Sequence, residues 1–316
     1  MNRQWIALSA VVLSFTATPV FAHNGDVTDQ RPTATNGPWQ QINVPATVET
    51  TVRGEHRTLK PGCAHGGPYS FFYRAGDPSR LLIYLDGGGS CWSDHTCVTS
   101  LTVNMDPSLY DPVIDADDLP RSTGAMDNED PNNPFAGWTI VYLPYCTADV
   151  HWGSKDTTYE DLTGLVTGVQ GGEFTVQHRG FDNVLAVRHW MRQNLNRDTV
   201  NKVFISGSSA GAYGAVLAYP VLRPLFRNAR AGMLADGGSG IITQSFYDAA
   251  VVGEDFTSGN WGIDENLPWN LYRAGLLAEA GPDYFNTVAY AVLGFNYPHD
   301  RFAQYSTAWD GLQTLA

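Results

Sequence analysis

The stretch Gly207-Ser208-Ser209-Ala210-Gly211 decides the fold, because it places a serine between two glycines directly after the apolar run Val203 to Ile205. A Gly-x-Ser-x-Gly pentapeptide between a strand and a helix is typical of a nucleophile elbow, a tight turn that exposes its serine. The outer positions must be small, since side chains there would collide with the neighbouring strand or helix. The pentapeptide alone is also compatible with an ordinary turn that has no catalytic role. With its flanking segments it predicts that Ser209 is a catalytic nucleophile.

A second glycine cluster, Asp86-Gly87-Gly88-Gly89-Ser90-Cys91-Trp92, directly follows the apolar run Leu81 to Leu85. Backbone N–H groups of consecutive glycines can face a developing oxyanion without obstruction, and the residue after the nucleophile supplies another donor. We therefore expect an oxyanion hole made by Gly88, Gly89 and Ala210. A flexible turn or a phosphate loop is the alternative, but no Gly-Lys-Ser/Thr follows the cluster. Ser90 and Trp92 are expected to line the substrate site.

The acid of a catalytic triad follows the serine in α/β-hydrolases, and the histidine comes last. Asp310 follows the predicted strand Arg301–Tyr305 and is the favoured acid. Asp236, after the strand that follows the elbow, is the rival, although it could instead cap the next segment.

The histidine is the missing member of this triad, since no histidine follows Asp310 in the 316 residues. Of the eight present, His151 is best placed, just beyond the predicted strand that ends at Leu143. As the base it would break the usual chain order, so a structural or substrate-lining role is favoured. We expect the chain to be truncated before the segment that carries the base.

Length and composition indicate one globular domain, because 316 residues with 43% hydrophobic content can bury a single substantial core. Residues 1–22 have Arg3, an apolar stretch and a terminal Val20-Phe21-Ala22, which is typical of a secretory signal peptide. We predict a polar, disordered lead-in over 23–38 and one α/β-hydrolase domain over 39–316. The protein is expected to be secreted or periplasmic, and no later segment is apolar enough to span a bilayer.

Alternating strand-like and helix-like segments predict an α/β-hydrolase-like fold, with a mainly parallel sheet and helices on both faces. The clearest helix covers Phe181 to Leu195. Asn104 to Pro134 and Gly237 to Pro282 are interpreted as insertions over the cleft. The predicted strands are Ser70–Arg74, Leu81–Leu85, Thr139–Leu143, Val203–Ser206, Ala231–Ala235 and Arg301–Tyr305.

The charge of the chain argues against nucleic acid as a partner. With a formal net charge of −13, the chain lacks the excess of basic residues that binding to phosphates requires.

Four cysteines in an exported protein predict disulfides, and of the three possible pairings we favour Cys91 with Cys97 and Cys63 with Cys146. A zinc site completed by His95 is the runner-up, since the cysteines lack paired Cys-x-x-Cys spacing.

These motifs together resemble the pectin acetylesterases of plants and bacteria and the Notum carboxylesterases. The resemblance covers residues 60 to 316 approximately and rests on five segments: Leu85–Cys91, Val141–Cys146, Ser206–Gly211, Leu234–Asp236 and Ser306–Gln313. It implies an α/β-hydrolase fold, a Ser-Asp-His triad, deacylation of an ester, and no metal or organic cofactor. Two departures stand out. Ser90 occupies the position of a family tryptophan, and the family histidine has no counterpart.

The expected function is that of a secreted serine carboxylesterase that removes acetyl groups from a plant cell-wall polysaccharide such as pectin. The acidic charge argues against highly demethylated pectin, so xylan, another acylated glycan or a polyester stays open. A catalytically inactive glycan-binding protein and a serine peptidase on the same fold are the alternatives. The oligomeric state is not predicted.

Overall fold

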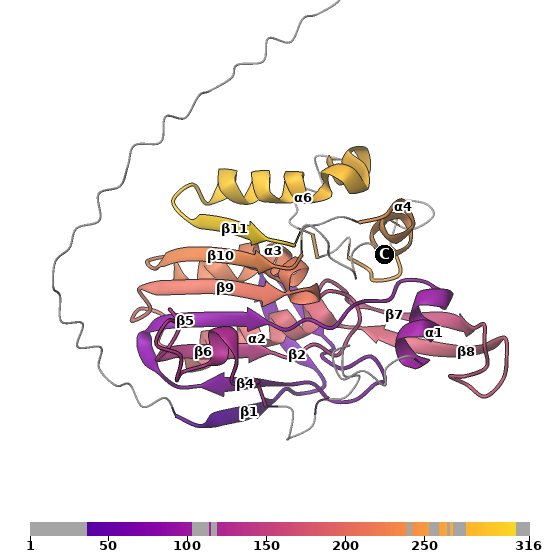
Figure 1. The fold of residues 1–316 in the computed structure, drawn as a ribbon, viewed down its shortest axis with the longest axis horizontal. Coiled ribbons are helices and arrows are strands. Elements are labelled where there is room, and N and C mark those ends of the chain that lie inside the picture. Colours follow the sequence, from indigo (N-terminus) through magenta and orange to yellow (C-terminus); the bar gives the residue numbers. More distant parts are fainter. Residues whose placement is uncertain are drawn as a thin grey trace, which may run out of the picture. The chain divides into compact units, whose positions relative to one another are not determined.

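A seven-stranded sheet organises the protein in the computed structural model, which describes residues 37–102, 114, 119–238, 242–252, 259–263, 266–267 and 276–307 (Figure 1). The strands lie in the order β1-β4-β6-β5-β9-β10-β11, and all neighbours from β6 to β11 are parallel. β4 is antiparallel to both β1 and β6. Their bounds are β1 Trp39–Asn43, β4 Ser70–Arg74, β5 Asp77–Leu85, β6 Trp138–Leu143, β9 Lys202–Ser208, β10 Arg230–Asp236 and β11 Arg301–Tyr305. The predicted mostly parallel α/β sheet is confirmed.

The order of the strands reverses next to β5. The chain passes from β5 to β6 on one side, and then returns to place β9 on the other side of β5. In sheets of this kind, ligands bind in the crevice outside the carboxyl ends of the strands at such a switch point. The glycine cluster follows β5 and the elbow follows β9, so the topology brings both motifs to this crevice.

Helices α2 (Gly180–Asn194) and α3 (Ala210–Leu222) pack against each other, and α3 also packs on β5, β9 and β10. The predicted helix from Phe181 to Leu195 is confirmed as α2 with ends shifted by one residue. α6 (Leu276–Asn296) contacts α3 and has a kink at Gly281, where the backbone is non-helical before Pro282. Within the described ranges, no helix combines the length and apolarity needed to cross a bilayer.

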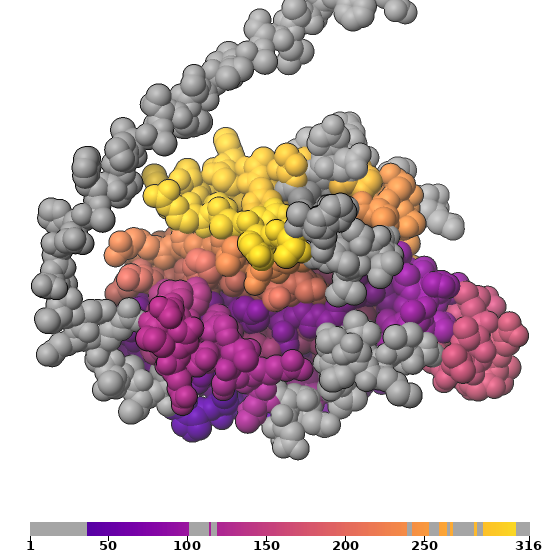
Figure 2. Space-filling model, viewed as in Figure 1, coloured from indigo at the N-terminus to yellow at the C-terminus, as the bar shows by residue number. Residues whose placement is uncertain are grey.

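Two hairpins were not predicted from the sequence, one formed by β2 (Val48–Val52) and β3 (Glu55–Leu59), the other by β7 (Lys155–Asp161) and β8 (Gly172–His178). The β7–β8 hairpin packs beside α1 (Asp94–Thr102), where the Glu160 amide donates to the Asp94 carboxylate at 2.9 Å. In Figure 2 this hairpin lies at the surface, and Leu165 and Val169 in its loop are 72% and 66% exposed.

The loop of the β7–β8 hairpin is organised by the carboxylate of Asp161. Its two oxygens accept hydrogen bonds from the amides of Gly164 (2.8 Å), Val166 (2.9 Å) and Thr167 (2.7 Å), and from the Thr163 hydroxyl (3.1 Å). Desolvation acts to raise the pKa of Asp161, but the bonds from Thr167 and Val166 outweigh it. The pKa of Asp161 is therefore well below its ordinary value, and the ionised carboxylate holds the loop.

Both favoured disulfides are present, Cys63–Cys146 and Cys91–Cys97. Because these two disulfides pair all four cysteines, no thiolate is left to bind zinc, and the zinc site that His95 would complete is wrong. The predicted signal peptide and most of the lead-in fall on residues 1–36, outside the described residues. The predicted insertions are described only in part, and their expected position over the cleft stays a prediction.

Candidate active site

Ser209 lies between β9 and α3 in a left-handed backbone conformation, with φ 52° and ψ −120°. Residues other than glycine rarely adopt this conformation, and it persists only where surrounding contacts impose it. Here the Ser209 amide donates to the Asp236 carbonyl at 2.7 Å, and the Ser209 carbonyl accepts from the Ala212 amide at 2.9 Å. The side chain is partly exposed at the carboxyl end of β9. This is the geometry of a nucleophile elbow.

The two outer glycines of the pentapeptide are required by contact with neighbouring backbone. A Cβ atom at Gly207 would lie 2.2 Å from the Gly211 carbonyl oxygen and 2.7 Å from that of Leu85. At Gly211 it would lie 2.1 Å from the Leu85 oxygen. All three distances are far below van der Waals contact. The turn can therefore pack against the end of β5 only because positions 207 and 211 carry no side chain.

The glycine cluster lies directly against the elbow. A Cβ atom at Gly87 would lie 2.3 Å from the Ser208 carbonyl oxygen and 2.9 Å from Ser209 Cβ. Gly88 and Gly89 have positive φ angles of 154° and 78°. Among the described residues, nothing accepts a hydrogen bond from the amides of Gly88, Gly89 or Ala210. These three amides are therefore donors without an acceptor in the described chain, on the two turns that meet where Gly87 approaches Ser209.

His151 holds the start of the glycine cluster through a hydrogen bond to the Asp86 carbonyl. Its side chain is buried, with 2% exposure, and Nε2 donates to the Asp86 carbonyl oxygen at 2.8 Å. α3 packs on the ring, since a Cβ atom at Gly214 would lie 2.8 Å from His151 Cδ2. Burial lowers the pKa of His151 to about 4, so the imidazole is neutral near pH 7. With Nε2 committed to a carbonyl, this geometry favours the structural role of His151 over that of a catalytic base.

Asp149 is a buried group near the site that sequence reasoning missed. Its carboxylate accepts from the amides of His151 (3.1 Å), Gly153 (3.1 Å) and Gly180 (2.7 Å), and from the Thr147 hydroxyl (2.6 Å). Burial raises the pKa of Asp149 to about 7 against these bonds. The carboxylate joins the turn that carries His151 to the first turn of α2. The bond to Gly180 spans 31 residues, and no local pattern announces it.

The two candidate acids are placed differently. Asp236 ends β10 opposite Ser208 and Tyr305, and its carbonyl holds the Ser209 amide. Asp310 lies outside the described residues, which stop at Thr307. β11 nevertheless ends at the same edge of the sheet as the elbow, because the Gly237 amide donates to the Tyr305 carbonyl at 2.9 Å.

Aromatic side chains pack on the loop after the glycine cluster. The partly exposed Trp92 contacts Phe246 with ring centroids 5.0 Å apart, and Phe246 contacts Trp261 at 5.1 Å. Trp261 Nε1 donates to the Cys91 carbonyl at 2.8 Å, and Asn260 Nδ2 donates to that of Trp92 at 2.8 Å. Phe246 belongs to α4 (Gln244–Phe246), and η3 (Tyr247–Val252) follows it. Parts of the predicted second insertion thus pack beside Trp92, while Ser90 is partly exposed.

The sheet order, the switch point and the elbow define an α/β-hydrolase fold. Comparison with solved structures agrees: the Wnt deacylase Notum from Drosophila superposes with a TM-score of 0.55 in one crystal form and 0.54 in another. The first match covers 86% of this chain and 74% of the Notum chain at 16% identity. At that identity the likeness shows the shared fold alone.

The chain belongs to the pectinacetylesterase family, whose model matches residues 46–257. This family includes carboxylesterases. The range contains Ser209, both glycine motifs and the four cysteines.

Among curated proteins, this chain is similar to Notum carboxylesterases and to one Notum relative that is named as inactive. The palmitoleoyl-protein carboxylesterase NOTUM of Schmidtea mediterranea is 29% identical over 44% of this chain and 23% of its own length. The inactive palmitoleoyl-protein carboxylesterase notum1b of Danio rerio is 31% identical over 30% of this chain and 68% of its own. A third, notum1' of Xenopus laevis, is 26% identical over 49% of this chain and 29% of its own. The chain thus matches less than a third of the planarian and frog proteins.

Proposed function

We propose that this protein is a serine carboxylic-ester hydrolase in which Ser209 is the nucleophile and the amides of Gly88, Gly89 and Ala210 form the oxyanion hole. The observation that carries the proposal is the strained Ser209 turn beside amides that have no acceptor in the described part of the chain. Such donors cost no reorganisation when negative charge develops on the ester oxygen. A turn with only a structural role would have no need of free donors around a partly exposed serine.

In this mechanism Ser209 Oγ attacks the ester carbonyl carbon while its proton passes to a general base. The carbonyl oxygen becomes an oxyanion and binds the amides of Gly88, Gly89 and Ala210. When the intermediate collapses, the C–O bond to the alcohol breaks and the base returns the proton to the leaving oxygen. Water then hydrolyses the acyl-Ser209 ester by the same steps. We assign the acid that orients the base to Asp310 and keep Asp236 as the rival.

The proposed substrate is an O-acetyl group on a cell-wall polysaccharide. The family description names acetyl esters of pectin, whereas the animal relatives are named for palmitoleoyl-protein esters. The net charge of −13 favours a glycan of low charge over highly demethylated pectin. Two disulfides and the predicted signal peptide support action outside the cytoplasm.

One relative favours a second candidate function, since the protein from Danio rerio is named as inactive. A protein that is 31% identical to this chain over 102 residues is thus named as lacking the activity. On this alternative the cleft at the elbow binds a glycan and does not cleave an ester.

The experiment compares acetate release from acetylated xylan, acetylated pectin and p-nitrophenyl acetate by the wild type, Ser209→Ala and Ser208→Ala. Ser208 is the matched control because it precedes the nucleophile in the same turn. We expect Ser209→Ala to lower the rate by on the order of 10³-fold or more and Ser208→Ala to stay within a few-fold. Acetate release by Ser209→Ala at the wild-type rate would refute the assignment of Ser209 as the nucleophile. A folded wild type that neither releases acetate nor reacts with a fluorophosphonate supports the inactive alternative.

A further inference from the structure

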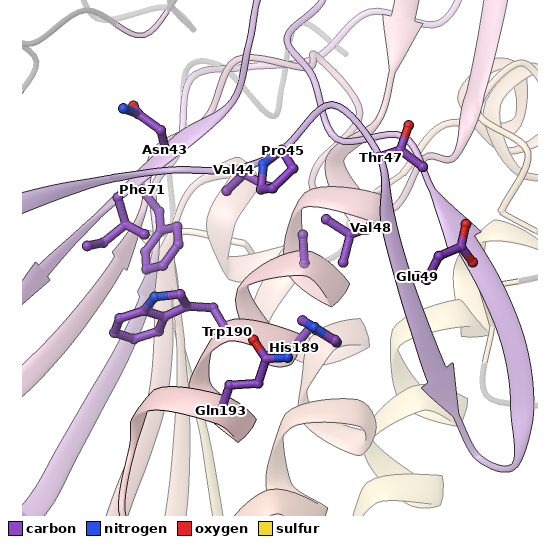
Figure 3. A pocket seen from close by; sticks show the side chains of 12 residues that line it. Asn43, Val44, Pro45, Thr47, Val48, Glu49, Phe71, His189, Trp190 and Gln193 are labelled. Carbon is purple, nitrogen blue, oxygen red and sulfur yellow. The ribbon is translucent and has the colours of Figure 1, made fainter.

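A cavity of about 370 Å³ lies between α2, the start of β4 and the segment that joins β1 to β2 (Figure 3). Its volume falls at the small end of the range for small-molecule sites. It is separate from the crevice at Ser209, because β4, β6 and β5 lie between β1 and β9 in the sheet. None of its lining residues takes part in the mechanism proposed above.

One wall of the cavity is the indole of Trp190, which is held in place by other rings. Phe71 contacts it edge-on with ring centroids 5.1 Å apart, and Tyr73 contacts it at 5.4 Å. Val44 and Val48, from the segment that joins β1 to β2 and from the start of β2, line the cavity as well. The cavity therefore offers a preformed apolar surface, so little binding free energy is lost in ordering these side chains.

Neutral hydrogen-bonding groups accompany this wall. In Figure 3, Trp190, His189 and Gln193 all rise from α2 toward Val44 and Val48. The His189 ring is oriented by a contact of 3.2 Å between Nδ1 and the Thr50 hydroxyl. Within the described residues, the Gln193 amide and Trp190 Nε1 have no hydrogen-bond partner. These groups are free to bind polar atoms of a ligand.

The charge of the lining selects against anions. Of the lining residues in the described chain, Glu49 alone is an Asp, Glu, Lys or Arg, and its carboxylate lies 3.3 Å from His56 Nε2. An anionic ligand would meet this carboxylate, and no Lys or Arg side chain there could balance it. A ligand that suits the cavity is neutral, with an apolar face for the walls and a polar edge for His189 and Gln193.

We propose that this cavity is a second carbohydrate site, which binds a neutral pyranose unit of a polysaccharide away from Ser209. A pyranose ring has the required C–H face and hydroxyl edge. The choice of a sugar among neutral amphipathic ligands rests on the proposed polysaccharide esterase function. Bound there, a polymer stays near the enzyme while its acetyl groups exchange at the elbow, which raises their effective concentration.

The test is isothermal titration calorimetry with unacetylated xylohexaose, mannohexaose and trigalacturonate, which carry no ester and report binding without turnover. We expect a neutral oligosaccharide to bind and trigalacturonate to bind more weakly. Gln193→Ala should weaken the neutral ligand by about three- to tenfold, the effect of one lost hydrogen bond. Trp190→Phe, which keeps an aromatic ring among Phe71 and Tyr73, should weaken it too. Asn196→Ala, an amide loss at an exposed residue just beyond the end of α2, should leave the affinity unchanged.

Circular dichroism verifies the fold of each variant, and Gln193→Ala decides the outcome if Trp190→Phe is unfolded. The proposal is overturned if neither neutral oligosaccharide binds, if Gln193→Ala binds as the wild type does, or if trigalacturonate binds most tightly. Ser209→Ala separates this site from the esterase proposal, because it should lose ester hydrolysis and keep the wild-type affinity for the oligosaccharide.

Discussion

Two loops of this protein are held in fixed conformations by opposite means. At the elbow after β9, the turn closes because Gly207 and Gly211 have no side chains that would meet the Leu85 carbonyl. In the loop between β7 and β8, a single side chain, Asp161, gathers the amides around its carboxylate. The conformation of the elbow should therefore be disturbed by an added methyl group, and that of the hairpin loop by loss of the negative charge on Asp161. Only the first kind of constraint leaves a side chain free for chemistry.

The largest effect is expected from Gly207→Ala. The new methyl group would overlap two backbone carbonyls that cannot move independently, so we expect a loss of about 3 kcal/mol in the free energy of unfolding. Urea denaturation measures it. Gly294→Ala is the control, because among the described residues no atom beyond the adjacent backbone of α6 lies within 4 Å of its Cβ position. That substitution should stabilise the protein by about 0.5–1 kcal/mol. Equal stability of the two variants would contradict steric control of the elbow.

A smaller loss is expected from His151→Phe, which tests whether the elbow region also depends on a hydrogen bond. The Asp86 carbonyl would lose its donor in a buried site, at a cost of about 1–3 kcal/mol in the free energy of unfolding. His151→Gln, which keeps a side-chain donor, should recover part of the stability and of the ester hydrolysis rate. A variant that abolishes hydrolysis with unchanged stability, and without rescue by Gln, would instead assign the base to His151.

The smallest effect is expected from Asp161→Asn, since it is confined to the hairpin loop. The folded pKa of Asp161 lies below its unfolded value, so its stabilising effect is present above about pH 4 and is lost as the pH falls further. Amide NMR shifts of Val166 and Thr167 should report this transition in the wild type. Asp161→Asn should lack it, whereas the exposed control Asp198→Asn should keep it. A wild-type loop that loses its order near neutral pH would argue against the carboxylate as its organiser.

What the sequence predicted well is what local constraints determine. The elbow needs glycines within five residues, and strands such as Ser70–Arg74 and Arg301–Tyr305 were predicted with their observed bounds. The β7–β8 hairpin was missed because β7 has the sequence Lys-Asp-Thr-Thr-Tyr-Glu-Asp, whose buried alternate positions include Thr157 and Asp161 and not only apolar residues. Its alternation is real, but the amplitude in hydrophobicity is small.

The supports of the candidate site escaped prediction for a different reason. The bond from His151 to the Asp86 carbonyl joins residues 65 positions apart, and Asp149 reaches Gly180 across 31. Contacts of this kind follow from the sheet order, which no single segment encodes. The roles of Ser209, Gly88, Gly89 and Ala210 stay predictions that the experiments above test. The acid Asp310 is a further prediction, on residues that the structure does not describe.

The backbone bonds that cross the edge of the sheet have a consequence for engineering. The Ser209 amide is tied to the carbonyl of Asp236, and the next amide, Gly237, is tied to that of Tyr305. These two bonds extend the ladder of the parallel strands one step past their ends. Main-chain hydrogen bonds therefore connect the end of β11 to Ser209 through Asp236 and Gly237. Because both bonds use main-chain atoms only, Asp236, the rival acid, can be replaced by Asn without removing the hydrogen bond to the Ser209 amide.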